Sequence, residues 1–321
     1  MSSRTFAWIR WALAAAILGY SAWQLSTAWG SLQGANLEVR PALVFAAAGF
    51  GALALVCLAL VSAVGVRAAG LPEGGAPPRF WIGWFRVWFQ GYFYRYIPGK
   101  LVLVVERVRL GEMMGVPRAA SVMLVVWESL LLMAGAGLLG GGGLLFLPLR
   151  GDEPVSGAAV ASLALVSLLG SILLWPVLRV LAVRLPALAA RLPGMVLNVS
   201  PQAQVGLVGG NALAWGLLGA SFAVFCAATC PAEVQSPSVA MLVTWFVASY
   251  VGGQLASVAP AGLGIREGLL VAGLSGQVPA PIALAWALGH RMLLTSVELA
   301  LVALATQVRM PGTPGGTGPE A

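Results

Sequence analysis

The sequence predicts an all-α polytopic membrane protein with two inverted repeats, each containing three transmembrane helices and one broken, re-entrant helical hairpin. Hydrophobic residues make up 59% of the 321 residues and charged residues only 9%, with a mean hydropathy of +0.90. Soluble domains carry about 25% charged residues. Apolar runs long enough to cross the hydrocarbon core recur along the chain. Two of these runs are interrupted by proline and glycine, at Tyr96–Lys100 and at Ser257–Glu267.

The first repeat is expected over residues 6–148. Its three spans are predicted at Phe6–Ala28, Pro41–Val66 and Ala119–Pro148, with the hairpin over residues 80–115. The hairpin should break at Pro98-Gly99, because proline lacks a backbone donor and clashes with the preceding turn. The aromatic and basic residues of Phe80–Ile97 are typical of the headgroup boundary of a bilayer.

The second repeat is expected over residues 155–308. Its spans are predicted at Val155–Leu178, Val205–Ala228 and Ala280–Val308, with an apolar run at Val239–Ala259 that breaks at Pro260–Gly264 and resumes over residues 265–275. Residues 310–321 are rich in glycine, proline and threonine and are expected to be disordered. We therefore expect a single integral membrane domain over residues 1–309.

The two halves align with each other at one offset. A shift of 162 positions places Pro98 on Pro260 and Pro117 on Pro279, and it also pairs Gly91 with Gly253 and Gly111 with Gly273. Each half has an odd number of full crossings, so the second half should enter the membrane from the opposite side. A helix break in hydrocarbon is tolerated only where protein or a water-filled cavity covers it. Paired breaks in corresponding halves therefore indicate a binding site between them.

Basic residues are distributed unevenly between the loops. Eight of the 18 arginines and lysines lie in residues 67–118 and three more lie in residues 179–204, whereas the alternate loops hold mainly acids or single arginines. The positive-inside rule then places both termini in the cytoplasm of a bacterial-type inner membrane. The net charge of +7 is explained by topology and anionic headgroups, so no nucleic-acid partner is expected.

No enzyme motif is present in the sequence. The chain has one histidine and three cysteines without metal-ligand spacing, and it lacks the motifs of zinc peptidases, serine hydrolases and P-loop proteins. We therefore expect no catalytic residue, metal or cofactor. The glycines at 140–143 are more typical of helix packing or a loose span end than of nucleotide binding.

Charges inside the predicted spans are the main candidates for function. Glu128, His290 and Arg291 lie deep in apolar runs, where a charge costs about 2.5–3.5 kcal/mol on insertion scales. They could serve a transported group, or Glu128 could pair with Arg291 merely to hold helices together. Arg95 and Lys100 flank the first break and could hold a phosphate with free helix amides, or they could only fix topology. Asn211, Gln90 and Gln254 are better explained as helix-packing residues.

At these residues the chain resembles the lysylphosphatidylglycerol synthase transmembrane-region, or flippase-like, family. The resemblance is carried by Tyr96-Ile97-Pro98-Gly99 with Arg107 behind it, by Gly115-Val116 before the span with Glu128, and by the segment Pro260–Glu267. It covers residues 7–308. Larger members of that family carry a cytoplasmic aminoacyl-transferase domain, which we do not expect here because the sequence ends about a dozen residues after its last predicted span. Ala261 also stands where members often have glycine or proline.

The resemblance implies a transporter that moves a phospholipid or lipid-linked headgroup between leaflets. The alternative is an accessory protein that presents lipid to a separate lipid-modifying enzyme. We expect the headgroup to lie in a polar cavity between the hairpins, with a positive wall of Arg95, Lys100, Arg107 and Arg266. The full set of expected substrate-binding residues is Arg95, Pro98, Gly99, Lys100, Arg107, Glu128, Pro260, Gly262, Gly264, Arg266, Glu267, His290 and Arg291.

Overall fold

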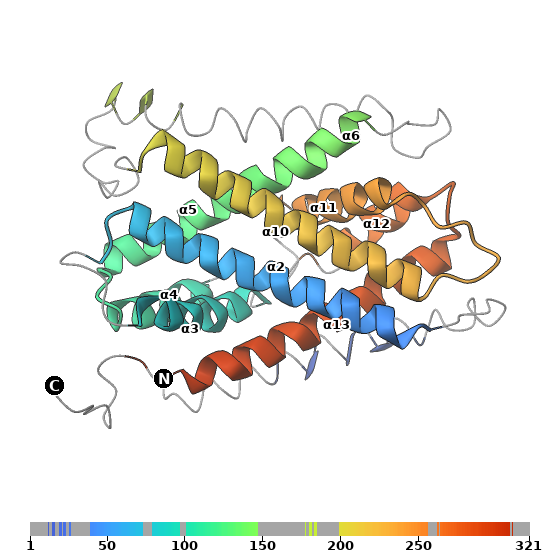
Figure 1. The fold of residues 1–321 in the computed structure, drawn as a ribbon, viewed down its shortest axis with the longest axis horizontal. Coiled ribbons are helices and arrows are strands. Elements are labelled where there is room, and N and C mark those ends of the chain that lie inside the picture. The colour runs from blue at the N-terminus through green and yellow to red at the C-terminus, as the bar shows by residue number, and fades with distance from the viewer. Residues whose placement is uncertain are drawn as a thin grey trace.

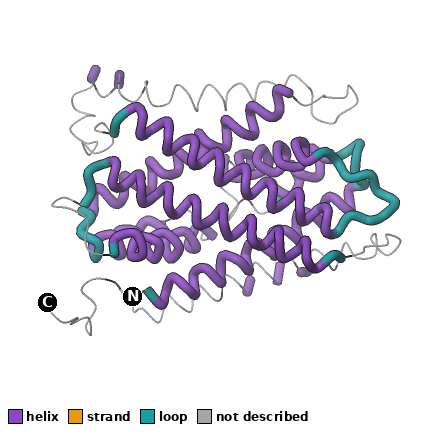
Figure 2. The backbone as a smooth tube through the Cα atoms, viewed as in Figure 1, coloured by secondary structure: helices purple, strands orange, loops and turns teal. Residues whose placement is uncertain are grey.

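The computed structural model describes residues 39–72, 79–96, 101–146, 199–255 and 264–308, together with Gly262, Met310 and scattered residues within 12–26 and 177–184. Every element in these ranges is helical (Figures 1 and 2). The elements are α2 (Pro41–Ala68), α3 (Phe80–Phe93), η1 (Tyr94–Tyr96), α4 (Leu101–Glu112), α5 (Arg118–Ala136), η2 (Gly137–Gly141), α6 (Gly142–Phe146), α10 (Pro201–Ala228), α11 (Val239–Leu255), α12 (Ile265–Leu274) and α13 (Ala280–Gln307).

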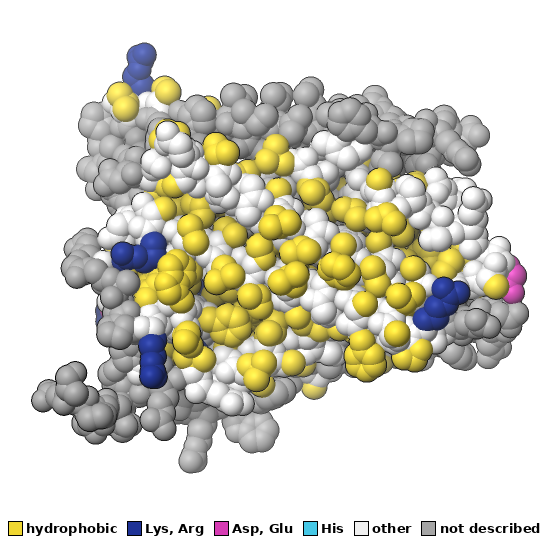
Figure 3. Space-filling view, viewed as in Figure 1, with side chains coloured by type: hydrophobic (Ala, Val, Ile, Leu, Met, Phe, Trp, Pro, Cys, Tyr) yellow, Lys and Arg dark blue, Asp and Glu magenta, His cyan; other side chains and the backbone are white. Residues whose placement is uncertain are grey.

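Four helices are long and apolar enough to cross a membrane: α2, α5 with its continuation to Leu144, α10 and α13. They lie along the long axis of the molecule, and α2 packs against α10 over most of its length (Figure 1). On the face drawn in Figure 3, apolar side chains cover the middle, whereas the described charged side chains lie toward its ends. The helical elements of the described residues confirm the all-α class. The apolar middle and the charged ends suit a protein embedded in a bilayer.

The shorter helices form two packed pairs. Helix α3 packs on α4 and α11 packs on α12. The 14 residues of α3 span only about 21 Å at 1.5 Å per residue, less than the hydrocarbon core. In Figure 1 the α3–α4 pair lies beside one end of α2, and the α11–α12 pair lies beside the other end. A helical pair was expected at both places. The first predicted break, at Pro98-Gly99, falls outside the described residues, and only Gly262 and Gly264 of the second, Pro260–Gly264, are described.

Most aromatic rings of α3 pack in the protein core, and their expected depth at the headgroup boundary stays a prediction. Trp84 and Phe89 are each 1% exposed and Trp88 is 5% exposed, whereas Trp81 keeps 51% of its surface. Since α3 packs against α2, α4 and α13, only one of its faces is left for lipid. The rings therefore stabilise the helix pair from inside.

The glycines at 140–143 serve helix packing. They lie in the π-helical turn η2 and in α6, which pack against α11. A Cβ atom at Gly143 would lie 2.3 Å from Oγ1 of Thr244, and one at Gly140 would lie 3.0 Å from Cγ1 of Val247. A side chain at either position would push α11 away, so the glycine run sets the spacing between these elements.

Helix boundaries differ from the predicted spans by a few residues. Helix α10 begins at Pro201 rather than Val205, because Ser200 accepts a hydrogen bond from the Ala203 amide at 3.2 Å and caps the first turn. Proline then occupies the first helical position, where no donor is needed. The predicted spans at residues 6–28 and 155–178 and the tail after Met310 lie outside the described residues, apart from isolated helical positions within 12–26.

Candidate functional site

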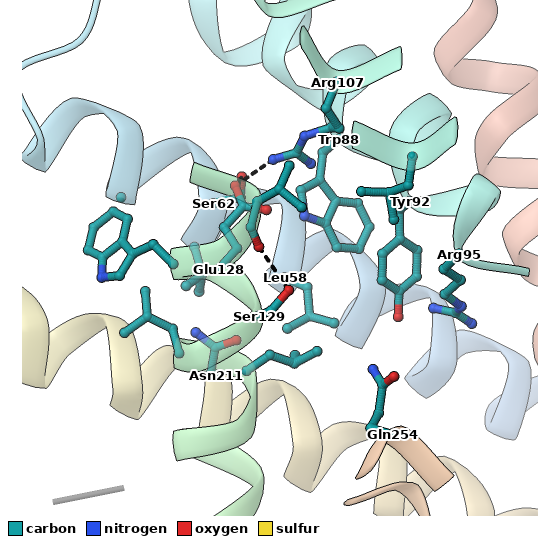
Figure 4. A pocket seen from close by; sticks show the side chains of 17 residues that line it. Leu58, Ser62, Trp88, Tyr92, Arg95, Arg107, Glu128, Ser129, Asn211 and Gln254 are labelled. Atoms are coloured by element: carbon teal, nitrogen blue, oxygen red, sulfur yellow. Dashed lines mark hydrogen bonds and ion pairs between the residues drawn. The ribbon is translucent and has the colours of Figure 1, made fainter. Parts of the chain in front are cut away.

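A cavity of about 100 Å³ lies among the helices of the first half, with contributions from α10 and α11. Figure 4 shows its lining side chains. Helices α2, α3, α4 and α5 supply most of its wall, and one side chain each comes from η1, α10 and α11. The polar lining residues are Ser62, Trp88, Tyr92, Arg95, Arg107, Trp127, Glu128, Ser129, Asn211 and Gln254.

One end of the cavity is organised by the carboxylate of Glu128. Its Oε1 atom accepts hydrogen bonds from Nη2 of Arg107 at 2.5 Å and from Oγ of Ser62 at 2.5 Å. Trp84 Nε1 in turn donates to Oγ of Ser62 at 2.8 Å. Both line the cavity, and Glu128 is the more exposed partner at 21%, against 5% for Arg107. Four helices are thus joined at one partly buried carboxylate, as expected for a charge inside a membrane.

Gly91 makes room for Arg107. A Cβ atom at this position of α3 would lie 2.3 Å from Cδ of Arg107. The stem of Arg107 therefore passes directly over the α3 backbone on its way to Glu128. The guanidinium also lies 5.6 Å from the centroid of the Trp84 ring, within the range of a cation–π contact.

The other end of the cavity is formed around Arg95. Nη2 of this arginine bonds Oε1 of Glu298 on α13 at 2.5 Å, and its guanidinium carbon lies 3.9 Å from the centre of the Tyr92 ring. Figure 4 shows Tyr92, Arg95 and Gln254 on this side, away from Glu128. Each of the two cavity arginines is therefore matched by a carboxylate, and a guanidinium is also suited to bind an oxyanion.

A second group of polar side chains surrounds His290 in the other half. The ring is fully buried and lies within 5.2–5.7 Å, centroid to centroid, of Phe222, Phe225 and Phe246. Its Nε2 atom lies 3.0 Å from Oγ of Ser221, and its Nδ1 atom has no hydrogen-bond partner among the described residues. His290 does not line the cavity described above.

Glu267 links the start of α12 to α13. Its Oε2 atom accepts the Gly264 amide at 2.8 Å, and its Oε1 atom accepts a hydrogen bond from Nη1 of Arg291. Gly262 and Gly264 have positive φ angles of 70° and 83°, which glycine adopts without steric cost. Arg266 lies 3.2 Å from the centre of the Tyr250 ring and 5.1 Å from that of Phe246. Gly264 and Glu267 thus cap the first turn of α12.

The expected site residues therefore separate into groups. Arg95, Arg107 and Glu128 line one cavity, whereas Gly264, Arg266, Glu267, His290 and Arg291 belong to the second group, and Gly262 precedes it. A single positive wall that includes Arg266 is thus wrong. The suggested ion pair between Glu128 and Arg291 is also wrong, because the partners are Arg107 and Glu267. Pro98, Gly99, Lys100 and Pro260 lie outside the described residues.

Several cavity residues were not expected from sequence. Ser62 is one serine in a long apolar helix, and the sequence around it gives no sign that it lines a cavity. Asn211 and Gln254 were assigned to helix packing, and Asn211 does donate to the Leu207 carbonyl at 2.9 Å, but both side chains also line the cavity. Glu298, which pairs with Arg95 but is not among the lining residues, was visible as an acid within a span, and this depth was the available signal.

Comparison with protein families and with curated proteins found no relative of this chain. No protein-family model matches this chain, and no curated protein matches it significantly. Among the described residues, no group of three histidine, cysteine or acidic side chains could hold a metal ion. The resemblance to the lysylphosphatidylglycerol synthase transmembrane region stays a prediction.

Proposed function

We propose that this protein is a flippase-like transporter that carries the headgroup of a phospholipid through its central cavity. The observation that supports this most is a polar cavity between helices of membrane-spanning length, with Arg95, Arg107 and Glu128 on its wall. Ionisable groups at such depth in a membrane usually mark a pathway for a polar or charged substrate. The proposal agrees with the family resemblance inferred from sequence.

The size and chemistry of the cavity favour a headgroup over a whole lipid. About 100 Å³ suffices for a phosphate and a few attached atoms but not for acyl chains, which would stay in the surrounding bilayer. Arginine binds phosphate oxygens with paired donors. Arg95 and Arg107 could each exchange a carboxylate for a phosphate at small electrostatic cost, because one anion replaces another. Glu128 would accept a hydroxyl or ammonium of the headgroup.

The arrangement of helices supports the two inverted repeats that such a mechanism needs. Helices α2 and α10 each have 28 residues, begin with proline and pack against each other. The helix pairs α3–α4 and α11–α12 lie at opposite ends of the long axis (Figure 1). We propose that the first pair enters from the cytoplasm and the second from outside, with both termini in the cytoplasm of an inner membrane.

A reconstitution experiment tests the function. Purified protein is placed in vesicles of phosphatidylcholine that contain a trace of fluorescent phosphatidylglycerol, and a membrane-impermeant reductant bleaches the outer leaflet. Translocation should make most of the inner-leaflet fluorescence accessible within minutes, whereas protein-free vesicles should keep their inner leaflet, about half of the total fluorescence, protected. Protection equal to that of protein-free vesicles would contradict the proposal. Lipid binding without translocation would instead indicate a protein that presents lipid to another enzyme.

A further inference from the structure

The polar groups of the two halves occupy equivalent elements. Under the 162-residue shift, Glu128 on α5 corresponds to His290 on α13, and Trp84 on α3 corresponds to Phe246 on α11. Glu128 is hydrogen-bonded to a serine of α2, and His290 is hydrogen-bonded to a serine of α10, Ser221. The chain thus places a serine and an ionisable group on matching pairs of long helices.

The arginines lie on corresponding helices, although not at equivalent positions, since the same shift places Arg107 on Leu269. Arg107 on α4 lies 5.6 Å from the Trp84 ring, and Arg266 on α12 lies 5.1 Å from the Phe246 ring. Trp84 and Phe246 are equivalent positions of the first limbs, and both arginines are on second limbs. Each half therefore combines one arginine, one aromatic ring, one serine and one ionisable group from four corresponding helices.

The two groups differ in how open they are. The first surrounds the cavity of about 100 Å³, whereas the gap bounded by Phe246, Arg266, Glu267, Ala287 and His290 leaves no space for a water molecule. In a protein with two inverted repeats, access alternates when one repeat rocks or gates against the other. An open site in one half and a closed site in the other is the arrangement expected of one end state.

The hydrogen bonds of Ser221 fix what the closed group offers a ligand. Ser221 donates its hydroxyl proton to the Ala47 carbonyl at 2.7 Å, so it accepts at 3.0 Å from Nε2 of His290. The neutral imidazole then carries its proton on Nε2 and presents a lone pair at Nδ1, which is fully buried and has no partner among the described residues. Such a buried acceptor usually has a partner in some state of the protein.

We propose that the gap around His290 and Arg266 is a second headgroup site, equivalent to the Glu128 cavity and closed in this conformation, which opens when the cavity closes. Its ligand is a phosphate with a neighbouring hydrogen-bond donor, as in phosphatidylglycerol. Arg266 binds the phosphate and Nδ1 of His290 accepts from the donor, just as Arg107 and Glu128 do in the cavity. The lipid identity rests on the proposed function, but the alternation of the two sites does not.

Cysteine accessibility tests the opening. Two single-cysteine proteins are compared in phosphatidylcholine vesicles with N-ethylmaleimide: one carries Ala287→Cys in a cysteine-free background, and the other keeps only Cys226. Ala287 is 7% exposed and faces the gap, whereas Cys226 is 0% exposed and lies in the core. We expect the cysteine at position 287 to react at least about tenfold faster, since it is exposed whenever the gap opens. Equal rates would overturn the second site.

A wedge in the cavity tests the coupling. Ser129 and Leu103 line the cavity, so Ser129→Trp or Leu103→Trp fills it and holds it open. In the Ala287→Cys protein that also carries either tryptophan, the cysteine at position 287 should react as slowly as Cys226, because the gap then stays closed. Two folded wedge variants that leave the rate unchanged would overturn the alternation. Neither measurement involves translocation. If the protein moves no lipid but shows both effects, the transport proposal is contradicted and the alternation of the two sites is not.

The ligand is tested by protection of the same cysteine. Replacing about a third of the phosphatidylcholine with phosphatidylglycerol should slow its modification at least about threefold, and His290→Phe should abolish this protection. Soluble sn-glycerol 3-phosphate, added to phosphatidylcholine vesicles, should not protect. Equal protection by the soluble phosphate would overturn a lipid ligand, and no protection by phosphatidylglycerol would overturn a headgroup site.

Discussion

Arg107 and Glu128 meet at 2.5 Å across the wall of the cavity, one from α4 and the other from α5. The arginine is 5% exposed, but the carboxylate keeps 21% and also accepts a hydrogen bond from Ser62. Because the acid borders open space, a ligand could reach it without the protein unfolding. The pair formed by Arg291 and Glu267 is buried on both sides, at 4% and 8% exposure, and is expected to behave differently.

Loss of the buried pair should be costly. Glu267→Ala leaves Arg291 charged without this partner and removes the cap on the Gly264 amide, so we expect the free energy of unfolding to fall by about 3–5 kcal/mol. Unfolding in mixed detergent micelles measures this. The control is Glu112→Ala, which removes an exposed pair with Arg118 and should cost at most about 1 kcal/mol. Equal losses in the two variants would refute the distinction.

Removing both charges should restore part of the lost stability. The double variant Glu267→Ala, Arg291→Met buries no unpaired charge, and replacing a buried ion pair by apolar side chains is often close to neutral. We expect it to unfold at higher detergent fraction than Glu267→Ala alone. If the double variant is less stable than the single one, the cost in Glu267→Ala does not come from the uncompensated arginine.

Two glycines of α12 should respond differently to alanine. A Cβ atom at Gly273 would lie 2.2 Å from the Trp245 ring, whereas one at Gly268 meets nothing within 4 Å. Gly273→Ala should therefore separate α12 from α11 and cost about 1–3 kcal/mol. Gly268→Ala should be neutral or stabilise the helix by up to about 1 kcal/mol. The same micelle assay compares them, and similar values would argue against the close packing of the two helices.

The two ends of the molecule should face opposite compartments. Ala232 lies in the turn between α10 and α11, and Glu112 ends α4, so they mark opposite ends of the long axis (Figure 1). In a cysteine-free background, an impermeant maleimide should label Ala232→Cys in intact cells, but Glu112→Cys only after lysis. The reversed pattern would contradict the proposed orientation, and labelling of both in intact cells would contradict opposite faces.

Much of the helical layout could be predicted from the sequence. The length of an apolar run and the prolines and glycines that interrupt it determine where a membrane helix begins and ends. Helices α2 and α13 start at the predicted Pro41 and Ala280. The break between α11 and α12 also follows local chemistry, since glycines at 262 and 264 adopt positive φ.

Side-chain partners could not be predicted in the same way. Depth alone showed that Glu128 needs a partner, and Arg291 was suggested, but only the helix packing shows that the partner is Arg107. The choice depends on Gly91, whose missing side chain lets Arg107 cross α3. The burial of the aromatic residues of α3 was not predicted, because aromatic residues suit both a headgroup boundary and a protein core, and only the packing of α3 on α2, α4 and α13 shows that most of them are buried.

The most direct test is the translocation rate of Glu128→Gln. Glutamine preserves the volume and can still accept hydrogen bonds from Arg107 and Ser62, so expression and unfolding should stay close to wild type. Translocation of fluorescent phosphatidylglycerol should fall at least tenfold, about 1.4 kcal/mol in the barrier, because the carboxylate that faces the headgroup is lost. The matched control, Glu112→Gln at the surface, should translocate normally. A stable Glu128→Gln protein with the wild-type rate would contradict the role of this cavity in transport.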